Sequence, residues 1–127
     1  MSVKRLRTGL EATLATIRRG GPARAGVAGF QAMVEAAPDL VTRHSTKGDV
    51  LYASPSAVAV AGTSAAALAG QGLVRRVHVA DLPAYLKALS DAANGRDPVT
   101  VEFRFRHGDG DRFVAMEMRC RPLRGEQ

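Results

Sequence analysis

Residues 99–123 read VTVEFRFRHGDGDRFVAMEMRCRPL and decide the fold. On both sides of the glycine-rich centre of this stretch, apolar and polar side chains alternate, and a period of two is typical of strands that bury one face. Met116 and Met118 therefore fall on one face, and Glu117 and Arg119 fall on the other. The stretch predicts a long antiparallel hairpin whose apolar face covers a core.

The residues before this hairpin predict one well-defined helix and a first, shorter hairpin. Asp81 is a good N-cap, and apolar residues then recur at helical spacing until Gly95. Between residues 55 and 72, small side chains and glycines favour only short helical turns. Residues 40–54 predict two short strands around a turn that contains glycine. The expected order is therefore strand, strand, short helices, one longer helix and a long hairpin.

The N-terminal residues predict an amphipathic basic helix over 1–19. Apolar side chains recur there at spacings of three and four, which is the pattern of a heptad stripe. The stripe consists of Val3, Leu6, Leu10, Leu14 and Ile17. Two interpretations stay open: the last four of these residues form a dimerisation seam, or the stripe packs on the protein's own globule. Glycines and Pro22 then predict a linker over 20–26, with the globular domain over 27–127.

The composition fits one globular domain with its excess charge at one end. The chain has 127 residues, of which 24% are charged, and these values are ordinary for a single domain. Of the net charge of +6, residues 1–24 contribute +5, because they hold six basic residues and one acidic residue. Few aromatic side chains are present to stack on bases, so this distribution does not predict nucleic-acid binding.

Apolar runs in the chain are far shorter than the roughly 20 residues that a membrane helix needs. Charged residues throughout 1–20 also interrupt the apolar core that a secretory signal requires. We therefore expect a cytoplasmic location for the domain, and leave open a membrane tether elsewhere in a parent protein.

The sequence contains no constellation that predicts catalysis or a metal site. His44, His78 and His107 do not share one element at metal-ligand spacing, and the single cysteine, Cys120, lies in a predicted strand. The serines and threonines have no histidine and aspartate at a recognisable spacing. We expect neither a metal ion nor enzyme activity in these residues.

One set of apolar residues is a candidate ligand pocket. Met116 and Met118 are able to line a small cavity with Tyr52 and Phe103, because methionine side chains adapt to irregular shapes. Methionines at strand alternation are also ordinary core residues, and this second interpretation stays open. The sequence identifies no ligand for such a pocket.

Several motifs together resemble those of PAS domains across nearly all of residues 27–123. The segment FQAMVEAAPDLV from Phe30 is similar to the family's entry segment, and VHVAD at 77–81 is similar to the family's usual VHPDD entry into its longest helix. VEFRFR from Val101 and EMRCRPL from Glu117 resemble the family's final hairpin. The wording of these motifs resembles PAS domains of cell-cycle-type bacterial sensor histidine kinases, of the DivJ, PdhS and DivL kind.

This resemblance implies an α+β fold, an antiparallel sheet with short helices on one face, preceded here by the N-terminal helix. The family's fifth strand, central in the sheet beside the first, should follow Leu123, but the chain stops at Gln127. An open centre would leave backbone groups unpaired. We therefore expect a partner chain, strand exchange or a rearranged sheet to close the gap, and we expect a homodimer or a strand-exchanged oligomer.

The resemblance also implies a regulatory role for the chain. The expected function is that of a sensor and dimerisation module in a two-component sensor histidine kinase, working through contacts with protein partners. An alternative is a small-molecule receptor domain coupled to a nucleotide cyclase or a transcription factor. The residues expected at the interface are Leu6, Leu10, Leu14, Ile17, Glu117 and Arg119.

Two cofactors known from PAS domains are not expected in this chain. Relatives that bind haem use a histidine on the long helix, and residues 82–93 contain no histidine. Flavin-binding relatives carry a reactive cysteine in a helical Asn-Cys-Arg motif, whereas Cys120 lies in a predicted strand. A small hydrophobic side chain in the core is the role that we expect for Cys120.

Overall fold

The protein is described from a computed structural model, in which residues 11–20 and 39–123 are the described parts of the chain. The strands are β1 (Glu11–Arg19), β2 (Leu40–Ser45), β3 (Val50–Ala53), β4 (Val99–Arg106) and β5 (Phe113–Pro122). The helices are α3 (Ala57–Ala61), α4 (Ala65–Leu68) and α5 (Leu82–Asn94), with the 3-10 turns η2 (Val74–Arg76) and η3 (Val79–Asp81). No helix in the described residues has both the length and the apolar character to cross a membrane.

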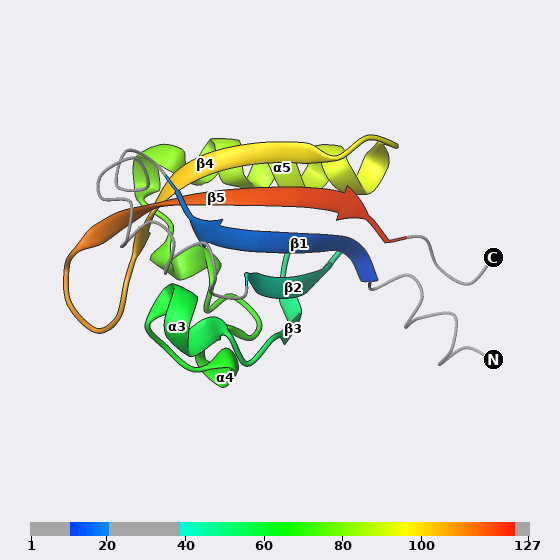
Figure 1. Ribbon diagram of the computed structural model, residues 1–127. Coiled ribbons are helices and arrows are strands. Elements are labelled where there is room, and N and C mark those ends of the chain that lie inside the picture. Colours follow the sequence, from blue (N-terminus) through cyan, green and yellow to red (C-terminus); the bar gives the residue numbers. More distant parts are fainter. Residues whose placement is uncertain (1–10, 21–38, 124–127) are drawn as a thin grey trace, which may run out of the picture.

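The five strands form one antiparallel sheet in the order β3-β2-β1-β5-β4. The α-helices pack on the same face of this sheet, where their buried residues join the inward side chains of the strands in one core. Figure 1 shows α5 lying behind β4 and β5, with α3 and α4 beside the β2–β3 end. The α+β fold predicted from the sequence is therefore confirmed, as are the first hairpin, the short helices and the long final hairpin.

The helix predicted over 1–19 is wrong where the structure describes it, because Glu11–Arg19 is a β-strand. Burial alternates along this strand, and Ala15 and Ile17 are fully buried between less buried neighbours. Side chains three positions apart share a helix face but point to opposite faces of a strand. Leu14 and Ile17 therefore do not form one stripe, while Leu6 and Leu10 lie outside the described residues.

The gap expected in the centre of the sheet is filled by β1 from the same chain. This strand lies between β2 and β5, which is the place of the family's fifth strand. Of the three expected ways to close the gap, a rearranged sheet is therefore the one that the structure shows. The domain start predicted at residue 27 is also too late, because β1 belongs to the sheet. Self-association stays a prediction.

The start of β1 lies beside the end of β5. Thr13 is in register with Pro122, and the Leu123 amide donates a hydrogen bond of 2.9 Å to the Ala12 carbonyl. A strand that followed β5 through a tight turn would run in the direction that β1 takes, antiparallel to β5. In this sheet β1 is therefore equivalent to the missing strand, although it enters from the other end of the sequence.

The predicted helix at 82–94 is confirmed, but the Asp81 side chain does not cap it. The Asp81 carboxylate instead accepts hydrogen bonds from Arg104, at 2.8 Å from the backbone nitrogen and 2.9 Å from each of two guanidinium nitrogens. These bonds to Arg104 hold the pKa of Asp81 at about 2. Asp81 thus ties the start of α5 to β4. On the inner side, Tyr85 of α5 meets Phe103 edge to face, with ring centroids 5.1 Å apart.

Candidate interaction surface on the open face of the sheet

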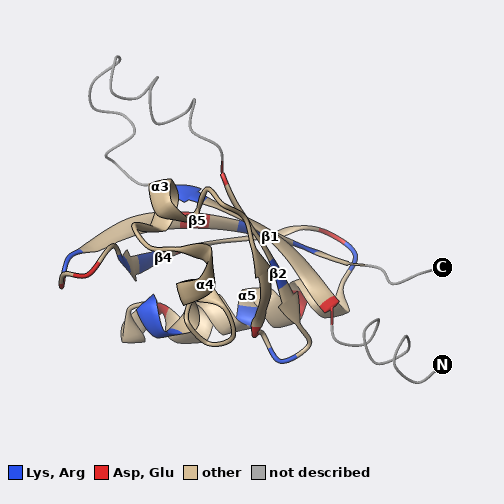
Figure 2. Ribbon diagram, turned by 90° about the horizontal axis from the view of Figure 1, so that it is seen from below, with Lys and Arg blue, Asp and Glu red and all other residues tan. Residues whose placement is uncertain are grey.

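The sheet face opposite α3, α4 and α5, here called the outer face, carries polar and charged side chains. None of the described helices packs on it, and Figure 2 shows basic positions recurring along the strands. Glu117 and Arg119 lie on this face, since they alternate with Met116 and Met118, which are buried. The strand alternation in the sequence therefore placed these two predicted interface residues correctly on the outer face, while their contact with a partner stays a prediction.

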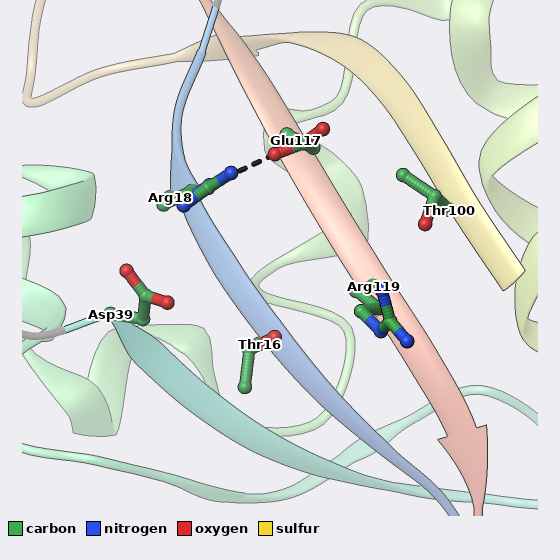
Figure 3. A pocket seen from close by; sticks show the side chains of 6 residues that line it. All are labelled: Thr16, Arg18, Asp39, Thr100, Glu117 and Arg119. Atoms are coloured by element: carbon green, nitrogen blue, oxygen red, sulfur yellow. Dashed lines mark hydrogen bonds and ion pairs between the residues drawn. The ribbon is translucent and has the colours of Figure 1, made fainter. Parts of the chain in front are cut away.

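A shallow depression of about 290 Å³ lies on the outer face over β1, β5 and β4 (Figure 3). A second depression of about 210 Å³ continues along the same strands and shares Thr16 and Arg119 with the first. Together they form a groove along β1 and β5, here called the outer groove. It is lined by Leu14, Thr16, Arg18, Asp39, Thr100, Glu117, Arg119 and Arg121.

The upper end of the outer groove in Figure 3 holds an ion pair across β1 and β5. Arg18 Nε donates to Glu117 Oε1 at 2.9 Å, and the two residues are direct cross-strand partners. Both side chains are partly exposed, so the pair contributes little to stability. Its effect is local: it neutralises Arg18 and holds Glu117 against β1.

Arg119 occupies the middle of the outer groove. It is in register with Thr16 on β1 and with Thr100 on β4, so that one threonine flanks it on each side. Figure 3 shows the two threonines on either side of Arg119. Directly opposed side chains of neighbouring strands lie about 5 Å apart at their Cβ atoms. A guanidinium between two hydroxyl groups is an arrangement that suits an oxyanion.

The structure separates the residues that were predicted to line a ligand pocket. Phe103, Met116 and Met118 are buried together in the core on the inner face of the sheet. Tyr52 is 41% exposed on the edge strand β3, and the Arg43 guanidinium lies 4.9 Å from its ring centroid. Tyr52 therefore does not contribute to a pocket with the other three, because it is in register with Arg43 of β2, whose side chain lies on the outer face.

The interior contains several polar side chains that the sequence did not single out as a group. Cys120 is fully buried, as expected, and its burial raises the pKa of the thiol to about 12. The Tyr85 hydroxyl is buried without a hydrogen-bond partner among the described residues. His44 is also fully buried, beside Thr42 on β2. In the described residues, no group of three or more histidine, cysteine, aspartate or glutamate side chains is arranged to hold a metal ion.

The hydrogen bonds of His44 define its tautomer. Nδ1 lies 3.1 Å from the Gly48 carbonyl oxygen, which only accepts, so Nδ1 carries the proton. Nε2 therefore accepts from the Thr42 hydroxyl at 2.8 Å. Burial lowers the pKa of His44 below its ordinary value of 6.5, although the bond to Gly48 opposes this shift. The neutral ring is the form that this site holds.

His44 is expected to make the domain sensitive to mild acid. The unfolded chain binds a proton near pH 6.5 and the folded chain does not, so stability present at neutral pH is lost as pH falls below 6.5. Between pH 7 and 5.5 the free energy of unfolding should therefore drop more in the wild type than in His44→Gln. Urea titrations at the two pH values measure this difference, and equal losses in both proteins would contradict it.

Sequence reasoning missed five residues of the outer groove, namely Thr16, Arg18, Asp39, Thr100 and Arg121. Thr100 and Arg121 were on the polar face of the predicted final hairpin, so alternation alone was enough to find them. Thr16 and Arg18 were not found because their segment was assigned to a helix. Asp39 reaches the groove only through the pairing of β2 with β1, which sequence periodicity does not specify.

The described residues form an α+β domain. It has an antiparallel five-stranded sheet, α-helices on one face and a grooved polar surface on the other. A family model described as PAS fold matches residues 50–127, which is more than half of the chain. The chain therefore belongs to the PAS family and is a sensory or signalling module. The match covers β3 through β5 and leaves β1 and β2 outside. A comparison with curated proteins finds no match.

Proposed function

We propose that this PAS domain is the regulatory module of a two-component sensor histidine kinase and that it signals through its outer face. The observation that carries the proposal is the outer groove. It crosses the centre of the sheet, and polar and charged side chains from three strands line it. A sheet face of this kind, with no described helix on it, is suited to contact with a protein partner. The domain itself would carry out no chemistry.

The position of β1 supports a link between the interior and the outer face. Ile17 is buried in the core, while the adjacent Arg18 is paired with Glu117 on the outer face. A shift of β1 would therefore change the packing inside and the charge pattern outside together. Such a strand is able to move a signal by population shift between two arrangements of the sheet, if a partner prefers one of them. A cytoplasmic location and self-association remain parts of this proposal.

Site-specific photocrosslinking tests the proposed partner. A photoreactive residue is placed at Thr100 in the outer groove, or at Leu86, which is exposed on α5 on the opposite side of the domain. In the host cell, Thr100 should cross-link to the catalytic or dimerisation part of a histidine kinase, and Leu86 should not. The captured kinase is then assayed with and without the purified domain, and its autophosphorylation should change with wild-type protein but not with Thr100→Arg.

If Thr100 cross-links to a nucleotide cyclase or a transcription factor, regulation of a histidine kinase is rejected, but the outer face is still the surface that contacts the partner. Equal cross-linking from Thr100 and Leu86 would reject the interaction face itself.

The Tyr85 hydroxyl, which has no hydrogen-bond partner in the described part of the chain, favours a second candidate function, a small-molecule receptor. A buried hydroxyl without a hydrogen bond costs about 1–3 kcal/mol. A ligand carrying a polar group next to the Tyr85 ring, between α5 and the inner face of β4, would recover this cost. The buried surroundings of Tyr85, with Phe103 on one side, would select an otherwise apolar molecule.

A Tyr85→Phe variant separates the ligand-free domain from a ligand receptor. Removing an unsatisfied hydroxyl should stabilise the purified protein by about 1 kcal/mol, because the ring packing is kept and a desolvated polar atom is lost. Thermal unfolding measures the change, with Phe103→Leu as a control that alters packing only. If Tyr85→Phe is less stable than wild type and a co-purified compound is lost with it, the receptor function is supported instead.

A further inference from the structure

The charges of the outer face divide into two regions along the strands. Near one end, Glu117 is opposed by Arg18 on β1 and by Glu102 on β4. Two residues further along β5 comes Arg119, and two further comes Arg121. The charges named at the Glu117 end, one arginine and two glutamates, thus sum to −1, whereas the Arg121 end is basic.

At the basic end, three arginines surround one apolar side chain. Leu14 of β1 is in register with Arg121 on β5 and with Arg43 on β2, and Arg119 follows in the next row of outward side chains. We call Arg43, Arg119, Arg121 and Leu14 the arginine cluster. Leu14 lines the outer groove together with Arg119 and Arg121.

Two of these arginines lack a carboxylate partner among the described residues. Arg43 has a distant one, with 3.5 Å between its Nη1 and Glu11 Oε2. Arg119 and Arg121 form no ion pair in the described part of the chain, where the salt bridges join Arg18, Arg43, Lys87 and Arg104 to their acids. Both side chains are exposed. Like charges held on neighbouring positions of a sheet repel one another, so this end of the groove would gain from bound negative charge.

We propose that the arginine cluster binds an acidic amphipathic helix of a partner protein. The inference rests on the proposed function, because it names the kind of segment that the outer face recognises. Arg119 and Arg121 are two positions apart on a strand, a separation of about 6.7 Å, and residues at i and i+4 of a helix are separated by about 6 Å along the axis. Two glutamates four residues apart therefore match the two guanidinium groups, and an apolar side chain between them covers Leu14.

The chain's own N-terminal segment does not complement this site. Residues 1–10 include Lys4, Arg5 and Arg7 and contain no acidic residue. A second copy that presented the same arginine cluster would add repulsion. An acidic partner is the occupant that removes the charge imbalance, and the threonines beside Arg119 add hydroxyl donors for a carboxylate.

The experiment is an NMR titration of the full chain with designed peptides. The probe is an N-acetylated helical peptide with leucine on one face flanked by glutamates at i and i+4, and the matched control replaces each glutamate with glutamine. The acidic peptide should shift the amides of β1 and β5, and its affinity should fall with added salt. Arg119→Glu/Arg121→Glu should weaken binding at least about tenfold, whereas Arg75→Glu, an exposed arginine in η2, should leave the affinity unchanged.

Several outcomes would overturn the proposal: equal binding of the glutamine peptide, equal binding of a proline-interrupted acidic peptide, or the same amide shifts with inorganic phosphate at similar concentration. If the double charge reversal unfolds the domain, Arg119→Gln/Arg121→Gln decides in its place. A kinase cross-link from Thr100 that survives the double charge reversal would keep the proposed function and reject the acidic helix. If no kinase cross-link forms from Thr100 in the otherwise wild-type domain, the proposed function is rejected, whether or not the acidic peptide binds.

Discussion

An Ile17→Asp variant is expected to lose the cooperative unfolding transition of the domain. Ile17 is 1% exposed in the central strand, and its side chain lies in the core with Leu40 and Met118, its register partners. Truncating a buried isoleucine to alanine alone costs about 2–5 kcal/mol, and an unpaired carboxylate adds a desolvation cost. Because a domain has only about 5–15 kcal/mol of stability, the variant should be largely unfolded at 25 °C. Circular dichroism and urea titration measure this loss.

The matched control is Leu14→Asp on the same strand. Leu14 lies on the outer face among arginines, so an aspartate there meets water and opposite charge, and the change should stay within about 1 kcal/mol of wild type. In a heptad stripe, by contrast, the two positions would share one buried face. Equal damage from both substitutions would therefore favour a helix over β1.

A Gly72→Ala variant is expected to be the most damaging single-methyl change in the described loops. A Cβ atom at position 72 would overlap with the Ala67 carbonyl oxygen, which is backbone and has no rotamer to relieve the clash. The chain would have to shift between α4 and η2, where Leu68 and Leu73 are fully buried. We expect a loss of about 3 kcal/mol or more in the free energy of unfolding.

Gly110→Ala provides the comparison for this prediction. A Cβ atom at position 110, in the turn between β4 and β5, would meet nothing within 4 Å. Thermal unfolding should place this variant within about 0.5 kcal/mol of wild type. If both glycine variants unfold alike, the close approach of Gly72 to Ala67 does not exist in solution.

The sequence was sufficient to predict those elements whose side-chain pattern fits only one kind of secondary structure. Alternation over 99–121 fixed both the final hairpin and the inward and outward sides of its strands, since a one-residue slip would bury arginines. The helix after Asp81 followed from spacing, but the real role of the Asp81 carboxylate did not. Its three bonds to Arg104 join segments 23 residues apart, and only the folded arrangement creates them.

The segment from Glu11 to Arg19 shows why the sequence did not predict strand β1 and the groove residues that it carries. Leu10, Leu14 and Ile17 fit a helical period, and Thr13, Ala15 and Ile17 fit a strand period equally well. The segment forms a strand because, without it, β2 and β5 would each have an edge of unpaired backbone groups in the centre of the sheet. Tertiary context of this kind is absent from local periodicity. The same error concealed the β1 side of the outer groove.

The error in the predicted ligand pocket, which placed Tyr52 with three core residues, has a related cause. The prediction grouped Tyr52 with Phe103, Met116 and Met118 by side-chain type, but the register of β3 with β2 shifts between Arg43 and His44. That irregularity decides which side chains of β3 face inward. Apolar character did not decide it, because Tyr52 is stabilised outside by the Arg43 guanidinium.

If β1 of the same chain completes the sheet, a cysteine at position 15 should form a disulfide with the native Cys120. Residues 15 and 120 are register partners, and both are fully buried. Directly opposed residues in an antiparallel pair have Cα atoms about 4.5–5.5 Å apart, within the range that a disulfide spans. Thr16→Cys points to the outer face and serves as the control. Under mild oxidation, Ala15→Cys should give a cross-linked monomer on a non-reducing gel, and Thr16→Cys should not. A covalent dimer from Ala15→Cys would contradict the account, because the strand would then come from a second copy.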